Sequence, residues 1–178
     1  MKKNLVTKTL VGVSLMVGAI AASAESTVAQ ERFACDTNQM TTTVQTERGS
    51  IPLIQWTNRS FPPPYTPEQR CQIVSSRFKK FDNNGTLKYI KAAEVNSLPA
   101  LCVAAYAGGE CLPDGLLVTL KPGADANQTL LKILDRRVWA ANGAVRLQGS
   151  SDGKPQSIVS RVNGETYVDM EQFLNFNP

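Results

Sequence analysis

The chain has 178 residues, of which 19 are lysine or arginine, 15 are aspartate or glutamate and none is histidine. The absence of histidine excludes a Ser-His-Asp triad and a Cys-His pair, the commonest arrangements in hydrolases. The first 24 residues hold three of the basic residues and no acidic one, so without them the net charge falls from +4 to +1. A charge so close to zero does not predict a nucleic-acid partner.

The N-terminal segment predicts a secretory signal peptide at residues 1–24. Three lysines precede an apolar run from Leu10 to Ala22, and residues 22–24 (ASA) suit cleavage by signal peptidase. The run is shorter than the roughly 20 apolar residues that span a bilayer. A second suitable cleavage point follows Ala29, so the mature chain is expected to begin at Glu25 or Gln30.

The rest of the chain predicts one domain behind a short tail. Residues 25–31 are polar and are expected to be flexible. Residues 32–178 have the length of an ordinary single domain that buries its own hydrophobic core.

Four cysteines in an exported chain predict two disulfides, because their number is even and oxidising compartments favour the bond. No two of them are spaced like zinc ligands or like a C-x-x-C redox motif, so we predict neither a metal nor a cofactor. Of the three possible pairings we choose Cys35–Cys71 and Cys102–Cys111. The second pair brackets Gly108-Gly109, which predicts a tight reversal between two strands.

Three β-prone segments open the domain. They are residues 32–37, 42–46 and 50–56, and Pro52 places the third at the edge of a sheet. The polyproline stretch at residues 61–65 (FPPPY) is expected to be an extended lead-in to a helix.

The first helix is predicted to begin after Thr66, which acts as the N-cap ahead of Pro67 and Gln69. Apolar residues then recur at three- and four-residue spacing and predict one face that packs on a sheet. These residues are Cys71, Val74, Phe78 and Phe81. The sequence NNG at residues 83–85 is expected to end the helix.

The C-terminal half predicts two hairpins, a strand, a second helix and a short last helix. The expected ranges are 86–95 and 100–106 for the first hairpin, 116–120 for the strand, 157–162 and 165–168 for the second hairpin, and 169–173 for the last helix. Asp125 or Asn127 is expected to cap the second helix, and Asn142-Gly143 to end it. Together these elements predict an α+β fold, in which a mostly antiparallel sheet carries two main helices.

Basic and aromatic residues interleave in two short stretches, RFKKF at residues 77–81 and KYIK at residues 88–91. In an exported protein the basic residues are candidates for contact with anionic lipid headgroups or an acidic envelope polysaccharide. They are Arg77, Lys79, Lys80, Lys88 and Lys91. A simpler interpretation, which the helical spacing favours, is that the aromatic residues belong to the core and the charges are solvated.

Several separate blocks of the sequence resemble the cyanobacterial circadian oscillating protein family. They include RFACDT, IPLIQW, YTPEQRCQIVSSRF, GTLKYI, LCVAAYAGGEC, LLVTLKPG and YVDMEQFLN, in this order, and they contain all four cysteines. The resemblance runs from about Arg32 to Asn175. It implies a cyanobacterial protein that is exported or lies at the periphery of a membrane, and it supplies no catalytic residues because the family has no established activity.

We therefore expect an exported, non-catalytic protein of the periplasm, the thylakoid lumen or the medium. We expect it to associate peripherally with a membrane or another component of the cell envelope. The alternative is a hydrolase or carbohydrate-active enzyme that uses aspartate and glutamate. That alternative requires two acids to face each other in a pocket, and the sequence alone does not show that any pair, such as Asp114 and Asp135, converges.

Overall fold

The structure is a computed structural model that describes residues 31–47, 49–59, 61–141 and 158–175, with the backbone alone for residues 134–141. The predicted signal peptide and the predicted helix end at Asn142-Gly143 lie outside the described residues. The helices are α1 (Pro67–Asn83), α2 (Ala126–Ala141) and α3 (Met170–Asn175). The strands are β1 (Phe33–Asp36), β2 (Thr41–Thr46), β3 (Gly49–Gln55), β4 (Tyr89–Val95), β5 (Leu98–Ala104), β6 (Cys111–Thr119), β7 (Val159–Val162) and β8 (Glu165–Asp169).

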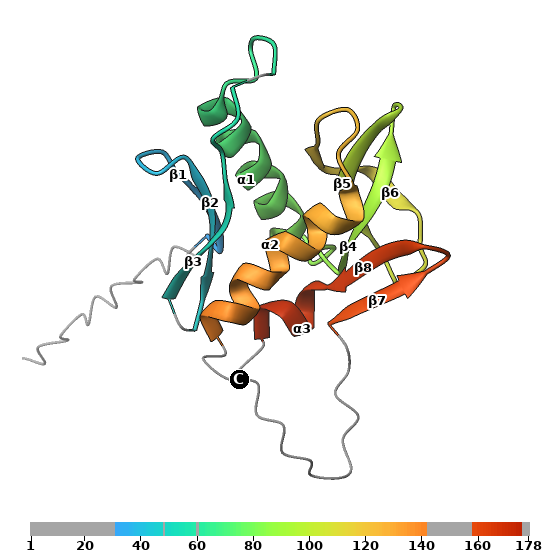
Figure 1. The fold of residues 1–178 in the computed structure, drawn as a ribbon. Coiled ribbons are helices and arrows are strands. Elements are labelled where there is room, and N and C mark those ends of the chain that lie inside the picture. Colours follow the sequence, from blue (N-terminus) through green and yellow to red (C-terminus); the bar gives the residue numbers. More distant parts are fainter. Residues whose placement is uncertain (1–30, 48, 60, 142–157, 176–178) are drawn as a thin grey trace, which may run out of the picture.

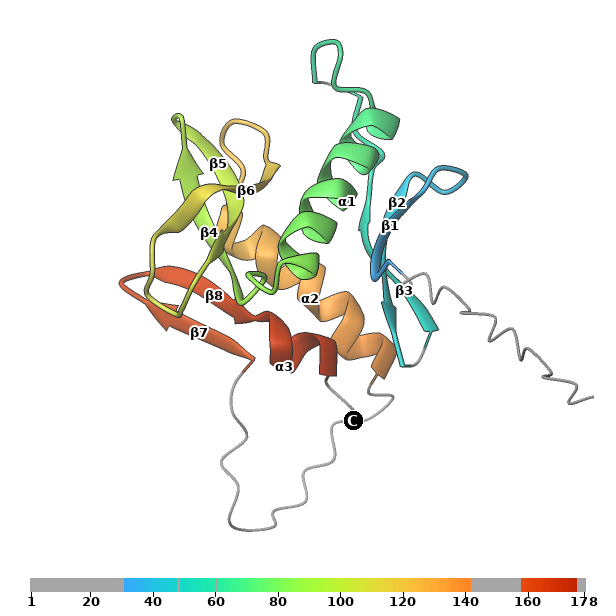
Figure 2. The same ribbon diagram turned by 180° about the vertical axis from the view of Figure 1, so that it is seen from behind.

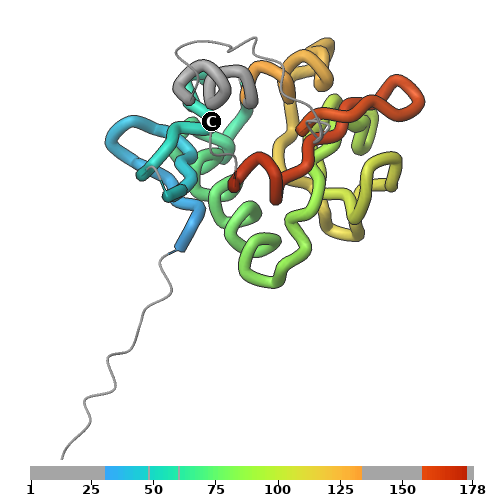
Figure 3. The backbone as a smooth tube through the Cα atoms, turned by 90° about the horizontal axis from the view of Figure 1, so that it is seen from below, coloured from blue at the N-terminus to red at the C-terminus, as the bar shows by residue number. Residues whose placement is uncertain are grey.

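The strands form two antiparallel sheets with α1 between them (Figure 1). One sheet has the order β1-β2-β3 and the other the order β6-β5-β4-β8-β7. The view from below shows the N-terminal sheet on one side of α1 and the C-terminal strands on the other (Figure 3). Helix α2 crosses the front and contacts strands of both sheets, β3 as well as β4, β5 and β8. The predicted α+β class is confirmed, but its strands form two sheets where the prediction had one.

Helix α1 begins and ends as its sequence predicts. The backbone of Thr66 is extended, as in other N-cap residues, and its side-chain oxygen accepts a hydrogen bond from the Gln69 N–H at 3.2 Å. The chain leaves the helix through Asn84 and Gly85, which has a φ of 70°. The predicted apolar face is buried, and one of its rings, Phe78, stacks on Phe33 of β1 with ring centroids 5.0 Å apart.

Both predicted disulfides are present, and the described chain has no free cysteine. The Cys35–Cys71 bond ties β1 to α1, whereas the Cys102–Cys111 bond ties β5 to β6 across the turn that joins them. The first bond therefore fixes the helix to the N-terminal sheet. The second closes a hairpin.

Two-residue turns join β4 to β5 and β7 to β8. Asn163 and Gly164 both have positive φ, as the predicted hairpin requires. Asn96 and Ser97 do the same in the first hairpin, so Leu98 and Pro99 belong to β5 and not to the turn predicted there. Positive φ at serine is uncommon, and the sequence therefore gave no strong signal for this turn.

Strand β6 starts at Cys111, five residues before the predicted start at Leu116. Its pairing with β5 shifts register near Cys102, and Asp114 has a φ of 57°. A Cβ on Gly115 would lie 2.7 Å from the Leu112 carbonyl oxygen, so only glycine fits there. The sequence PDG at residues 113–115 is typical of a turn, but in the fold it forms a bulge within a strand.

Aspartates cap the last two helices. Asp125 accepts a hydrogen bond from the Gln128 N–H at 3.0 Å, so it is the cap of α2. The other candidate, Asn127, instead accepts from the Thr166 N–H at 2.8 Å and links α2 to β8. Asp169 accepts from the Gln172 N–H at 2.9 Å and caps α3, which begins within one residue of the predicted start at residue 169.

Candidate ligand-binding pocket

A cavity of about 460 Å³ lies between α1 and β6, the edge strand of the five-stranded sheet. The loop between β3 and α1 bounds it as well, through Trp56 and Phe61. Its walls are mostly apolar and include Ile73, Val118 and Leu120. This volume falls within the range of about 300–1,000 Å³ that is usual for small-molecule sites.

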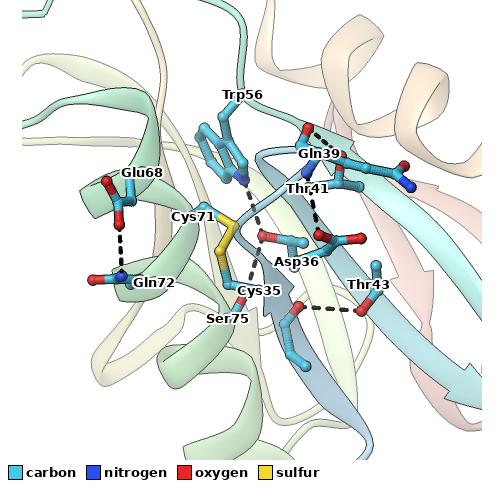
Figure 4. The surroundings of a disulfide bond; sticks show 12 residues. Cys35, Asp36, Gln39, Thr41, Thr43, Trp56, Glu68, Cys71, Gln72 and Ser75 are labelled. Atoms are coloured by element: carbon cyan, nitrogen blue, oxygen red, sulfur yellow. Dashed lines mark hydrogen bonds between the residues drawn. A yellow bond between two sulfur atoms is a disulfide. The ribbon is translucent and has the colours of Figure 1, made fainter.

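Trp56 is held in place by a buried polar network (Figure 4). Its indole Nε1–H donates a hydrogen bond to the Thr42 Oγ1 at 3.0 Å, and the Ser75 hydroxyl donates to the same oxygen at 3.0 Å. The network joins β2, the end of β3 and α1 next to the Cys35–Cys71 disulfide. Because every partner is buried and the elements are crosslinked, the orientation of the Trp56 ring is fixed before any ligand binds.

Replacement of Thr42 by valine is expected to lower the free energy of unfolding by about 1–3 kcal/mol. Valine has the same shape and suits a strand, but it leaves the Trp56 Nε1–H and the Ser75 hydroxyl without their buried acceptor. Urea denaturation followed by circular dichroism measures the loss. The matched control is Thr43→Val in the same strand, whose hydroxyl makes an exposed bond to the Ala34 carbonyl. Equal losses in both variants would contradict the role of the network.

Arg70 lies over two aromatic rings at the wall of this cavity. Its guanidinium carbon lies 4.6 Å from the centroid of the Trp56 ring and 3.9 Å from that of Phe61. Burial lowers the pKa of Arg70, yet a guanidinium stays charged at neutral pH. Within the described residues no carboxylate lies within 4.0 Å of it. The cavity therefore contains a partly desolvated positive charge that has no anionic partner in the described part of the chain.

Arg77 lies two turns further along α1 and lines the same cavity. Its Nη1 donates a hydrogen bond of 3.0 Å to the Leu117 carbonyl oxygen in β6. An edge strand presents unpaired backbone groups, and this bond occupies one of them. Arg77 thus connects the helix to the edge of the second sheet.

A second polar cluster surrounds Lys91 in β4, the central strand of the five-stranded sheet. The Lys91 side chain is 2 % exposed, and its Nζ lies 2.9 Å from the Glu165 Oε2 and 3.6 Å from the Glu110 Oε2. The Tyr167 hydroxyl donates to the Glu165 Oε2 at 2.7 Å, and the Nζ of Lys91 lies 5.3 Å from the centroid of the Tyr167 ring. Sequence reasoning missed this cluster because its members come from strands far apart in the chain.

The electrostatics of this cluster fit a structural ion pair. Burial acts to lower the pKa of Lys91, but the hydrogen bonds with Glu165 and Tyr167 outweigh it, and the net effect is a raised pKa. The hydrogen bond with Lys91 lowers the pKa of Glu165, although burial opposes it. A nucleophilic lysine needs a lowered pKa. The pKa of Lys91 is raised instead, which indicates a charged lysine that stabilises the fold.

The five basic residues predicted to contact an anionic surface do not gather on one face. Arg77 lies in the cavity, Lys79 pairs with Glu31, and Lys91 is buried with Glu165. Of the five, only Lys80 and Lys88 are exposed. Lys91 must therefore be removed from the predicted surface, because a buried and paired ammonium cannot reach a headgroup.

Two acids, Asp82 and Glu171, line one small hollow of about 220 Å³ near the C-terminal end of α1. The Arg32 Nη1 lies 3.5 Å from the Asp82 carboxylate in the same hollow. Burial raises the pKa of Asp82, and the charge of Arg32 partly offsets the effect. The ion pair indicates a structural role. Asp114 is exposed at the bulge of β6, and the side chain of Asp135 is not described.

Two classes of feature are absent from the part of the chain that the structure describes. No three cysteine, aspartate or glutamate side chains gather there as ligands for a metal ion. No helix among residues 31–141 and 158–175 is long and apolar enough to cross a bilayer.

The family model of the circadian oscillating protein COP23 matches residues 32–175. The chain belongs to this family. The matched range runs from the residue before β1 to the end of α3, so it contains both sheets, both disulfides and the whole cavity of the COP23-family domain. The resemblance seen in the sequence from Arg32 to Asn175 is thereby confirmed. No curated protein and no solved structure matches the chain.

Proposed function

We propose that this COP23-family protein is exported and acts outside the cytosol as a non-catalytic protein attached peripherally to a membrane surface. Two disulfides that use all four cysteines support the proposed compartment, since such bonds persist where the environment is oxidising. The predicted signal peptide supports it independently. The periplasm, the thylakoid lumen and the medium are the compartments to which such export leads.

Export makes a simple prediction about the natural protein. Its mass is expected to correspond to a chain that begins at Glu25 or Gln30, with no thiol that reacts with an alkylating reagent before reduction. Mass spectrometry of the protein isolated from its own cells, with and without reduction, measures both properties. A retained leader together with four reactive thiols would contradict export.

The observation that carries the proposed attachment is the loop ahead of α1. In both side views this loop projects beyond the rest of the fold (Figures 1 and 2). Pro62, Pro63 and Pro64 are exposed, and Tyr65 is 48 % exposed. Tyrosine favours the interface between lipid and water because its ring is apolar and its hydroxyl is polar.

Two exposed basic residues lie in or near the same loop. Arg59 within it is exposed, and so is Lys121, whose neighbour Pro122 lines the same cavity as Pro62. Each such charge is worth about 1 kcal/mol near an anionic membrane. The attachment surface is therefore defined as Arg59, residues 61–65 and Lys121, and it replaces the five residues predicted from the sequence.

The purified protein is expected to sediment with vesicles that contain phosphatidylglycerol and much less with vesicles of phosphatidylcholine. High salt should release it, because exposed charges are screened. Tyr65→Asp is expected to weaken the binding at least about fivefold. The matched control is Tyr106→Asp in the turn between β5 and β6, since Tyr106 is the other exposed large aromatic residue of the described chain. Equal binding by Tyr65→Asp and the unaltered protein would contradict the proposal.

A further inference from the structure

The cavity between α1 and β6 combines an apolar wall with two arginines, Arg70 and Arg77, neither of which has a carboxylate partner among the described residues. Arg77 already donates to the Leu117 carbonyl, whereas Arg70 has no oxygen partner among the described residues. A partly buried cation is costly unless an anion accompanies it. We infer that the cavity binds a small molecule that has an apolar body and one carboxylate, with the carboxylate against Arg70.

The geometry of Arg70 favours a carboxylate as the anionic group. The guanidinium carbon of Arg70 lies over the Trp56 and Phe61 rings, and neither ring has an oxygen that would accept a hydrogen bond from it. The N–H donors of the group lie in its plane, and no carboxylate among the described residues pairs with them. Two parallel donors match the two oxygens of a carboxylate, which makes the contact bidentate and directional.

The rest of the cavity fits an apolar body. Ile73 and Val74 of α1 line it together with Leu116 and Val118 of β6 and with Leu98, the first residue of β5. The rigid Trp56 ring forms another part of the wall, because Thr42 fixes it. Burial of a hydrocarbon body against these residues supplies about 25 cal/mol for each Å² removed from water.

This inference goes beyond the proposed attachment to membranes, and the two can fail separately. The attachment surface and the cavity share Phe61, Pro62 and Tyr65, so the two are separated by measurements on the unaltered protein. The ligand is a free molecule that binds in the absence of vesicles. If the protein binds vesicles but no free carboxylate, the result supports membrane attachment and contradicts the ligand site. If it binds a free carboxylate but no vesicles, the result supports the ligand site and contradicts membrane attachment.

The test is isothermal titration calorimetry of the protein, with both disulfides intact, against decanoate below its micelle concentration. Decanol provides the same chain without the charge, and acetate provides the charge without the chain. The unaltered protein is expected to bind decanoate about 10- to 100-fold more tightly than decanol, and to bind acetate undetectably. This comparison needs no variant, so it holds even if a substitution impairs folding. Equal affinities for decanoate and decanol, or no binding of decanoate, would overturn the inference.

Arg70→Leu is expected to remove the preference for decanoate over decanol, and Arg70→Lys to retain part of it, since lysine keeps the charge but not the bidentate edge. The matched control is Arg161→Leu, which removes an exposed arginine from β7 at the other edge of the sheet. Fluorescence of Trp56 in a Trp139→Phe background reports whether decanoate enters beside this ring. Occupation of the cavity by a second copy of the chain would appear in light scattering as a dimer that decanoate does not dissociate, and it would contradict the inference.

Discussion

Replacement of Glu165 by alanine is expected to lower the free energy of unfolding by about 3–5 kcal/mol. The change leaves the Lys91 ammonium charged in a site where its side chain is only 2 % exposed. The carboxylate of Glu110 compensates little, because it lies 3.6 Å away and its side chain is 96 % exposed. Urea denaturation at neutral pH measures the effect.

Substitutions of the two partners are expected to lower the free energy of unfolding by different amounts, and this difference is the control. Lys91→Met removes the buried charge and fills most of its volume, and it leaves Glu165, whose side chain is 42 % exposed, free to be hydrated. We therefore expect Lys91→Met to cost clearly less than Glu165→Ala. The double variant should recover most of the stability that Glu165→Ala loses. A larger loss in the double variant than in Glu165→Ala would show that the buried charge is not the cause.

The same ion pair sets a pH dependence. The pKa of Glu165 is lowered from its ordinary value of 4.5, so its contribution to stability is present above about pH 4.5 and is lost as the pH falls through the lowered value. The pKa of Lys91 is raised from 10.5, so its contribution is present below that pH and is lost as the pH rises through the raised value. The urea midpoints of the unaltered protein and Glu165→Ala should therefore converge in acid. A constant difference between them down to low pH would contradict this origin.

Removal of the Cys35–Cys71 disulfide by replacing both cysteines with alanine is expected to cost about 4 kcal/mol, against about 3 kcal/mol for Cys102–Cys111. The sequence separations are 36 and 9, and a longer loop leaves the unfolded chain more entropy when the bond is absent. Urea denaturation of the two double variants without reductant compares them directly. Each pair contains one fully buried cysteine, Cys71 or Cys102, so the cavities created are matched.

The first disulfide is also expected to influence the ligand cavity. Cys71 lies one helical turn before Ser75, which shares the Thr42 oxygen with Trp56. Near-ultraviolet circular dichroism of Trp56 should therefore change in the Cys35→Ala, Cys71→Ala variant and change little in the other. A greater loss of stability on removal of Cys102–Cys111 would contradict the expected order of stabilities. A greater change in the tryptophan signal in that variant would contradict the influence of Cys35–Cys71 on the cavity.

Local signals in the sequence predicted most of the secondary structure. Thr66 caps α1 through a contact with a residue three positions away, and Asp169 caps α3 in the same way. Asn163-Gly164 forms the predicted hairpin turn. Such features depend on a few neighbouring residues, so they can be recognised without knowing the rest of the fold. The bulge at Gly115 shows the limit, since residues typical of a turn form part of a strand when the partner strand continues beside them.

The sequence by itself determined the order of helices and strands, the pairing of the cysteines and the membership in the COP23 family. Only the tertiary structure decided that the strands divide into two sheets, that Lys91 is buried with Glu165, and that Arg70 lies over aromatic rings in a cavity. The physical reason is the range of the interactions. A cap or a tight turn is stabilised by residues that are adjacent in the chain, whereas burial and charge pairing depend on which distant strands lie side by side.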